Sequence, residues 1–202
     1  MAVQTVAVLG ARTRGRGIAR AAALGGYRTI LEDMSAAMLE QGVAWIRESL
    51  EGSVARGELT PQERDAALGR ITTARTVEDA CREADLVIEA FPEDEELEIE
   101  IFTLLDRFGK PGAIFASTAS SLSIREMAAM TACAERCVGL RFSSFEPQAK
   151  LLEVVRAPQT SPATIAACRE VARRMGREVV VRDEASGTQQ AEKRGGKTVR
   201  RP

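Results

Sequence analysis

A glycine-rich turn near the N-terminus is the first feature with a chemical meaning. It reads Gly10-Ala11-Arg12-Thr13-Arg14-Gly15 and follows the short apolar run from Thr5 to Leu9. Dinucleotide-binding proteins carry Gly-x-Gly-x-x-Gly where a strand turns into a helix, and the N-terminus of that helix faces the pyrophosphate. The first and third glycines match, so the pattern predicts that these six residues bind a dinucleotide.

Arg12 occupies the place of the second glycine. A glycine is favoured there because the pyrophosphate approaches the backbone closely. The Arg12 side chain could therefore clash with the cofactor. It could also swing outward and pair with the phosphates, since a guanidinium group is a good phosphate partner. Both alternatives stay open at this point.

Asp33 follows the second predicted strand, 23 positions after Gly10. A carboxylate at about this separation hydrogen-bonds the adenosine ribose in dinucleotide sites. Its charge would repel a 2'-phosphate, which favours NAD over NADP. The alternative is that Asp33 only caps the N-terminus of the following helix.

The chain contains no histidine, so any proton transfer near neutral pH must use another group. Its four cysteines form no Cys-x-x-Cys pair, and we expect reduced, buried thiols and no metal site. These cysteines are Cys81, Cys133, Cys137 and Cys168.

Short apolar strands alternate with amphipathic helices along the chain. Strands are expected at 5–9, 28–31, 86–90, 113–117, 138–142, 151–155 and 178–181, and helices at 15–24, 35–56, from 60 onward, 77–83, 95–108, 123–130 and 162–175. This order predicts an α/β fold: a Rossmann-like doubly wound, mostly parallel sheet with a helical hairpin inserted after the second strand.

Residues 1–184 are expected to form one NAD-binding Rossmann-like domain, and residues 185–202 a flexible basic tail without apolar periodicity. The formal charge of -1 shows no bias toward nucleic acid or membranes. The N-terminus enters a strand without a signal segment, which favours a cytoplasmic protein.

Four segments, in order, resemble the NAD-binding domain of L-3-hydroxyacyl-CoA dehydrogenases. They are VAVLGARTRGRGIARAAALGGY, ADLVIEAFPEDEELEIEIF, IFASTASSLSIREMA and RCVGLRFSSFEPQAKLLEVV. The resemblance covers about residues 3 to 184 and includes the helical hairpin. It implies NAD as the cofactor, acyl-CoA as the partner and an oxidoreductase of fatty acid metabolism.

The resemblance also places the family's catalytic residues. Ser120 matches a serine that touches substrate, and Glu153 matches a glutamate that orients the general-base histidine. Arg141 stands at the position of that histidine, so the base is missing. We expect Arg141 to form an ion pair with Glu153 instead.

Four further positions are implied by the resemblance. Glu93 approaches the cofactor, and Glu98 replaces a lysine that contacts cofactor and CoA. Ser49 and Arg56 match residues that contact coenzyme A, although each is alternatively a solvated helix residue. The family continues into a helical domain that dimerises and closes over the acyl-CoA. We expect that domain to be absent here unless another polypeptide supplies it, which leaves the oligomeric state open.

Three functions are therefore carried forward. The first is an NAD-binding domain of this oxidoreductase family with weak or lost catalysis. The second is a non-catalytic nucleotide-binding or protein-interaction module, or a decayed gene product. The third is an active enzyme that moves the proton through substrate or water.

Overall fold

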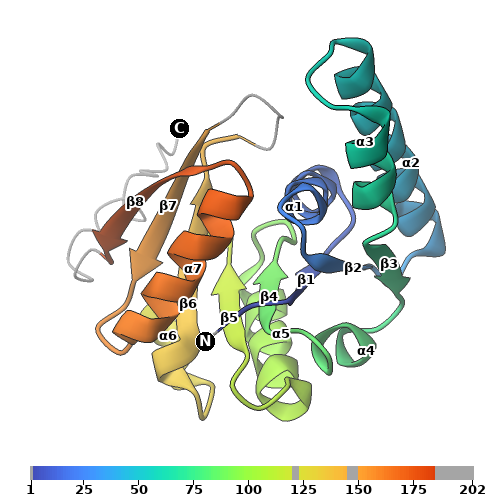
Figure 1. Ribbon diagram of the computed structural model, residues 1–202. Helices are drawn as coiled ribbons and strands as arrows, with labels where there is room; N and C mark the ends of the chain where they lie inside the picture. Colours follow the sequence, from blue (N-terminus) through green and yellow to red (C-terminus); the bar gives the residue numbers. More distant parts are fainter. Residues whose placement is uncertain (1, 120–122, 145–149, 185–202) are drawn as a thin grey trace, which may run out of the picture.

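The computed structural model describes residues 2–119, 123–144 and 150–184. These residues form one sheet in the order β3-β2-β1-β4-β5-β6-β7-β8 (Figure 1). The strands are β1 (Thr5–Leu9), β2 (Arg28–Glu32), β3 (Ile71–Ala74), β4 (Leu86–Glu89), β5 (Ile114–Ser117), β6 (Cys137–Phe142), β7 (Leu151–Arg156) and β8 (Glu178–Asp183). Only β6 and β7 pair antiparallel among them. The predicted mostly parallel α/β fold is confirmed.

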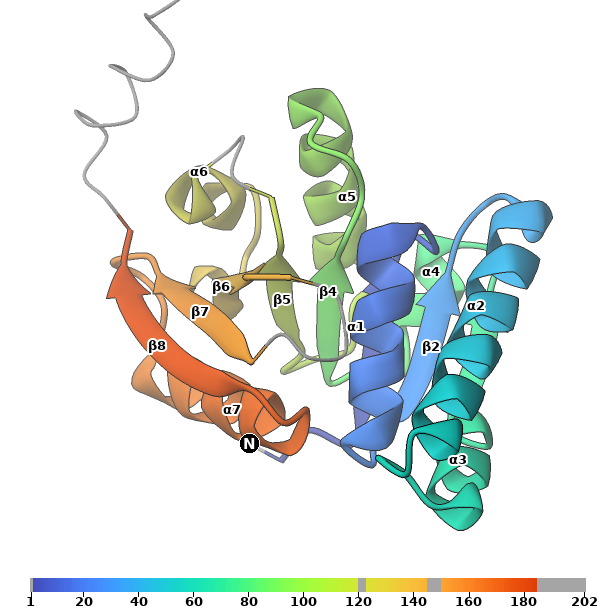
Figure 2. The ribbon, with the colours of Figure 1, turned by 90° about the horizontal axis from the view of Figure 1, so that it is seen from above.

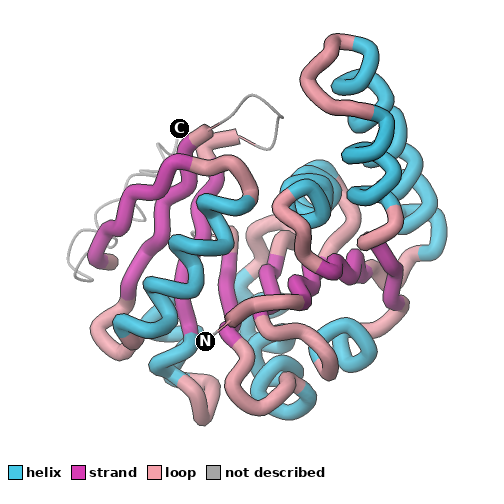
Figure 3. Tube along the Cα trace, in the orientation of Figure 1, coloured by secondary structure: helices cyan, strands magenta, loops and turns pink. Residues whose placement is uncertain are grey.

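Helices cover both faces of the sheet. They are α1 (Thr13–Leu24), α2 (Ala36–Ala55), α3 (Pro61–Leu68), α4 (Val77–Cys81), α5 (Glu95–Phe108), α6 (Ile124–Ala129) and α7 (Pro162–Arg174), with a 3-10 turn η1 (Ala134–Arg136). Figure 2 shows α5 and α6 on one side of the strands and α7 on the other. Figure 3 shows α2 and α3 side by side as the expected hairpin next to α1.

The central strand β1 is buried on both faces, which explains why it reads as a continuous apolar run. Val6 and Val8 pack with α1, α2 and α7, whereas Ala7 and Leu9 pack with α4 and α5. Because β1, β2, β4 and β5 are parallel, their carboxyl ends meet at one edge of the sheet. The candidate site is built along that edge.

The hairpin begins and turns where capping residues predict. The Ser35 hydroxyl accepts a hydrogen bond from Met38 N, which makes Ser35 the N-cap of α2. At α3, Glu63 N donates to Thr60 Oγ1 at 3.2 Å and Thr60 N donates to Glu63 Oε2 at 2.7 Å. These two reciprocal hydrogen bonds form a capping box at the start of α3, the helix expected from residue 60 onward.

The structure adds one strand that the sequence pattern did not indicate. β3 lies at the sheet edge beside β2, and its two central threonines are exposed. A four-residue strand with polar side chains outside has no apolar alternation to reveal it. No helix of the described residues is long and apolar enough to span a membrane. The predicted tail, residues 185–202, lies outside the described residues.

Candidate functional site

The glycine turn holds α1 close against the end of β1. Gly10 has φ +96°, a left-handed backbone that side chains disfavour, and its N–H donates to Glu32 O at 2.8 Å. A Cβ added to Gly15 would lie 1.6 Å from Gly10 O. The first and third glycines are therefore both required by the geometry. The turn presents the N-terminus of α1 to the edge of the sheet, as an anion site requires.

Asp33 fastens the end of β2 to this turn. Its Oδ2 accepts a hydrogen bond from Ala11 N at 3.0 Å, and its Oδ1 accepts one from Ser35 N at 2.9 Å. Since Ser35 is the N-cap of α2, the alternative that Asp33 serves as that cap is wrong. Asp33 also lines a cavity next to the turn, where a ribose contact stays a prediction.

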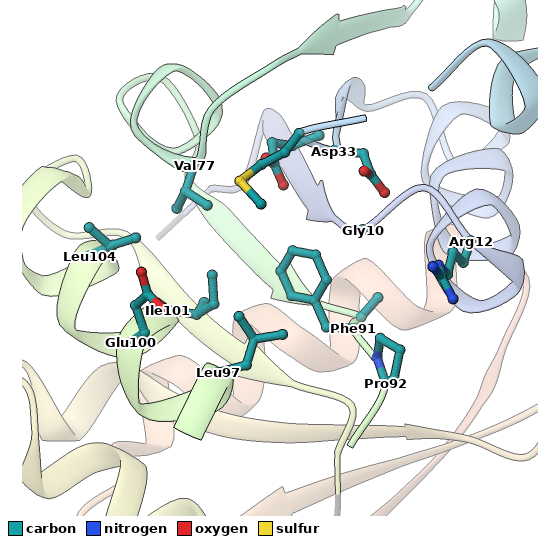
Figure 4. Close-up of a pocket in the computed structure, with 13 residues that line it drawn as sticks. Gly10, Arg12, Asp33, Val77, Phe91, Pro92, Leu97, Glu100, Ile101 and Leu104 are labelled. Carbon is teal, nitrogen blue, oxygen red and sulfur yellow. The ribbon is translucent and has the colours of Figure 1, made fainter. Parts of the chain in front are cut away.

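The cavity has a volume of about 350 Å³ and extends from the glycine turn to α5. Figure 4 shows Arg12 at one end and Leu104 at the other. Apolar side chains line the part toward α5, and the Phe91 ring lies next to Gly10 at the turn. The apolar residues toward α5 are Val77, Leu97, Ile101 and Leu104. The glycine turn, the Asp33 carboxylate and an apolar compartment therefore follow one another along the cavity. This order fits the phosphate, ribose and base of the adenosine half of a dinucleotide.

Two buried acidic residues, Glu89 and Glu32, lie at this edge of the sheet, and neither was among the predicted site residues. Glu89 ends β4 and accepts hydrogen bonds from Ser117 Oγ at 2.7 Å and Phe91 N at 2.6 Å. Burial raises the pKa of Glu89 above its usual value. Glu32 ends β2 and lines the cavity. The sequence signal that could have identified both residues is an acidic side chain at the end of an otherwise apolar strand.

Opposite charges meet beside the glycine turn. Arg14 on α1 lies 3.6 Å from Glu93, which follows β4, so the structure brings Glu93 to the turn. Glu98, in the first turn of α5, is buried. Its charge raises the pKa of Glu89, while the charge of Arg14 lowers it. Arg14 and Glu98 therefore both act electrostatically on Glu89, in opposite directions.

Residues 5–185 match the family described as "3-hydroxyacyl-CoA dehydrogenase, NAD binding domain". The chain belongs to the 3-hydroxyacyl-CoA dehydrogenase family. NAD is the cofactor of this domain. The resemblance given by the sequence motifs is confirmed.

Relatives and solved structures agree with this membership. The chain is 38% identical over 182 residues to a 3-hydroxybutyryl-CoA dehydrogenase of Bradyrhizobium diazoefficiens, covering 90% of this chain and 62% of that protein. The M. tuberculosis FadB2 crystal structure superposes with a TM-score of 0.86 at 38% identity, covering 93% of this chain and 66% of the other. The (S)-3-hydroxybutyryl-CoA dehydrogenase of Ralstonia eutropha gives 0.86 at 33% identity, with coverages of 91% and 65%.

Arg141 and Glu153, the two residues that the resemblance predicts at the family's histidine and glutamate positions, are directly opposite in the β6–β7 register. The predicted ion pair between them is wrong. Glu153 Oε1 instead accepts a hydrogen bond from Arg182 Nε at 2.7 Å, because the parallel strand β8 places Arg182 beside β7. Arg141 Nε is buried without a hydrogen-bond partner among the described residues.

The predicted CoA contacts lie on the hairpin of this 3-hydroxyacyl-CoA dehydrogenase domain. Ser49 is half-buried on α2, and Arg56 is the C-cap of that helix. The Arg56 guanidinium donates to Glu58 Oε1 at 2.8 Å and to Ser53 Oγ at 3.2 Å. Their CoA role stays a prediction. Ser120 lies outside the described residues.

Proposed function

We propose that this chain binds NAD through the glycine turn and its cavity, but turns over 3-hydroxyacyl-CoA weakly or not at all by itself. The proposal is carried by Arg141, which stands opposite Glu153 in the β6–β7 register. The resemblance of the sequence motifs implies a general-base histidine at that position. The Glu153 carboxylate forms an ion pair with the Arg182 guanidinium instead. An arginine at this position leaves the proposed active site without a general base.

The residues present fit NAD. The amino end of α1 and the glycine turn would face the pyrophosphate, and Asp33 would accept a hydrogen bond from the ribose. Arg12 is exposed at the cavity edge, where it would pair with a phosphate. Bound NAD supplies the hydride acceptor when the substrate alcohol is oxidised.

Oxidation of the alcohol also requires that a group accept the hydroxyl proton as the hydride leaves. A positioned base contributes about a hundred- to ten-thousand-fold to the rate. Guanidinium groups stay protonated at physiological pH and have no acceptor atom. Arg141 can therefore polarise a carbonyl oxygen but cannot take up the proton.

The proposed substrate is a 3-hydroxyacyl thioester of coenzyme A, with Ser49 and Arg56 contacting the CoA part and Ser120 the acyl part. Support comes from the relatives, which are named for such substrates. The chain spans 62% of the length of the first relative, so contacts to the acyl chain would extend to residues beyond the matched domain.

Calorimetric titration with NADH tests the cofactor half of the proposal. We expect binding in the micromolar to millimolar range. No binding at millimolar NADH would overturn the nucleotide function and favour a non-catalytic interaction module. The catalytic half is tested by acetoacetyl-CoA reduction with the wild type and Arg141→His. We expect little or no rescue, because the Glu153 carboxylate that would orient the new histidine is already bound to Arg182.

A further inference from the structure

A buried carboxyl group lines the cavity without a hydrogen-bond partner. Glu32 is the last residue of β2 and its side chain is 0% exposed. Neither of its carboxyl oxygens has a partner in the part of the chain that the structure describes. Burying a polar group in this way destabilises a fold unless something satisfies it. A ligand in the cavity would do so.

The strand register shows which way Glu32 faces. It pairs with Leu9 of β1 and Ala74 of β3, and both pack on the side of the sheet covered by α4 and α5. Glu32 therefore forms part of the sheet-side wall of the cavity, with α5 on the far side.

The position of a bound dinucleotide follows from the other contacts. With the phosphates at Gly10 and the adenosine ribose at Asp33, the base must occupy the remaining space toward α5. That space is lined by Leu97, Ile101 and Leu104, which offer apolar surface to the ring faces (Figure 4). The edge of the base then approaches Glu32.

We propose that Glu32 accepts a hydrogen bond from the exocyclic amino group of adenine and thereby selects an adenine base. This inference rests on the NAD binding proposed above and names a specificity residue within it. A carboxyl oxygen complements the amino group, which is a donor only. Asp33, one residue further along, serves the ribose.

Burial and then the neighbouring charge of Asp33 raise the pKa of Glu32 to about 7, against a smaller opposing effect of the nearby Gly10 N–H. That N–H donates its hydrogen bond to the backbone oxygen Glu32 O, so it does not satisfy the carboxyl group. The group is therefore largely neutral below that pH, which lowers the cost of keeping it in an apolar compartment. A glutamine would offer the same acceptor oxygen at nearly the same place. Leucine would offer no acceptor at all.

The test compares NADH with an analogue in which hydrogen replaces the adenine amino group. Affinities are measured by titration for the full chain. Wild type is expected to bind NADH about tenfold more tightly than the analogue, the effect of one hydrogen bond to a buried group. Glu32→Leu should reduce this ratio to about twofold or less, whereas Glu32→Gln should keep most of it.

Glu40→Leu is the matched control, because Glu40 is exposed on α2 and outside the cavity lining. It should keep the wild-type ratio. An unchanged ratio in Glu32→Leu, with NADH still bound, would overturn this inference and leave NAD binding intact. Failure of wild type and every variant to bind NADH would contradict both.

Discussion

Arg12 is the side chain that most changes the chemistry of the glycine turn. It is exposed at the cavity edge and is the N-cap residue of α1, with an extended backbone. Because its guanidinium can reach a phosphate, Arg12→Gly is expected to weaken NADH binding about three- to tenfold, and Arg12→Lys less. Titration at low and moderate salt measures this. Tighter binding by Arg12→Gly would mean that the side chain obstructs the cofactor.

Glu32 makes stability depend on pH in a direction opposite to that of most carboxylates. Its pKa is about 7 in the folded chain, against 4.5 as the ordinary value. Between these values the folded state binds more protons, so the free energy of unfolding falls as pH rises and the contribution is lost above about pH 7. The loss from pH 5.5 to 8.5 is about 2 kcal/mol.

Urea denaturation of the wild type and Glu32→Gln at these two pH values checks this dependence. The glutamine side chain does not titrate, so the variant should lose about 2 kcal/mol less than the wild type between them. Parallel losses in the two proteins would show that Glu32 has an ordinary pKa in the folded state.

The close approach of α1 to the end of β1 requires a glycine at position 15, because there is no space for a side chain there. A Cβ on Gly15 would collide with Gly10 O, which is backbone and cannot move aside cheaply. Gly15→Ala should therefore cost about 3 kcal/mol or more and abolish NADH binding. Chemical denaturation measures the cost.

Gly52→Ala is the control for that change. Gly52 is also helical, but its nearest obstacle is the flexible end of Arg56, so alanine should be neutral or stabilise the chain by up to about 1 kcal/mol. If Gly15→Ala were tolerated equally well, the close contact at the turn would be incorrect.

Elements with strong local signals were predictable, and pairings between distant elements were not. The glycine turn and the helices at 35–56 and from 60 onward were evident in the sequence, because each depends on neighbouring residues. β3 was not predicted, because an exposed edge strand needs no alternation of apolar and polar residues. The partner of Glu153 was mistaken because it depends on which strand lies beside β7.

The candidate site shows the same limit. Asp33 was found by its separation from Gly10, which the fingerprint fixes. Glu32 beside it was not, since its burial follows from the register of β2 with β1 and β3. Only the folded sheet shows that one acid faces the cavity wall while the next holds the turn.

The sheet has two functional regions, one that holds the proposed cofactor site and one that holds the proposed catalytic positions. The parallel strands β1, β2 and β4 carry the cofactor turn and cavity, which the family membership explains. The antiparallel pair β6–β7 carries Arg141 and Glu153, where we propose that the family's base is replaced. We therefore propose that this molecule can bind the cofactor without supporting proton transfer.

A single-turnover experiment separates them most directly. The purified chain, loaded with NADH, is mixed with acetoacetyl-CoA, and the loss of reduced nicotinamide absorbance is followed. We expect NADH to bind and to stay reduced over a time in which an active relative oxidises it completely. Rapid, stoichiometric oxidation of the bound NADH by the unmodified chain would contradict the account.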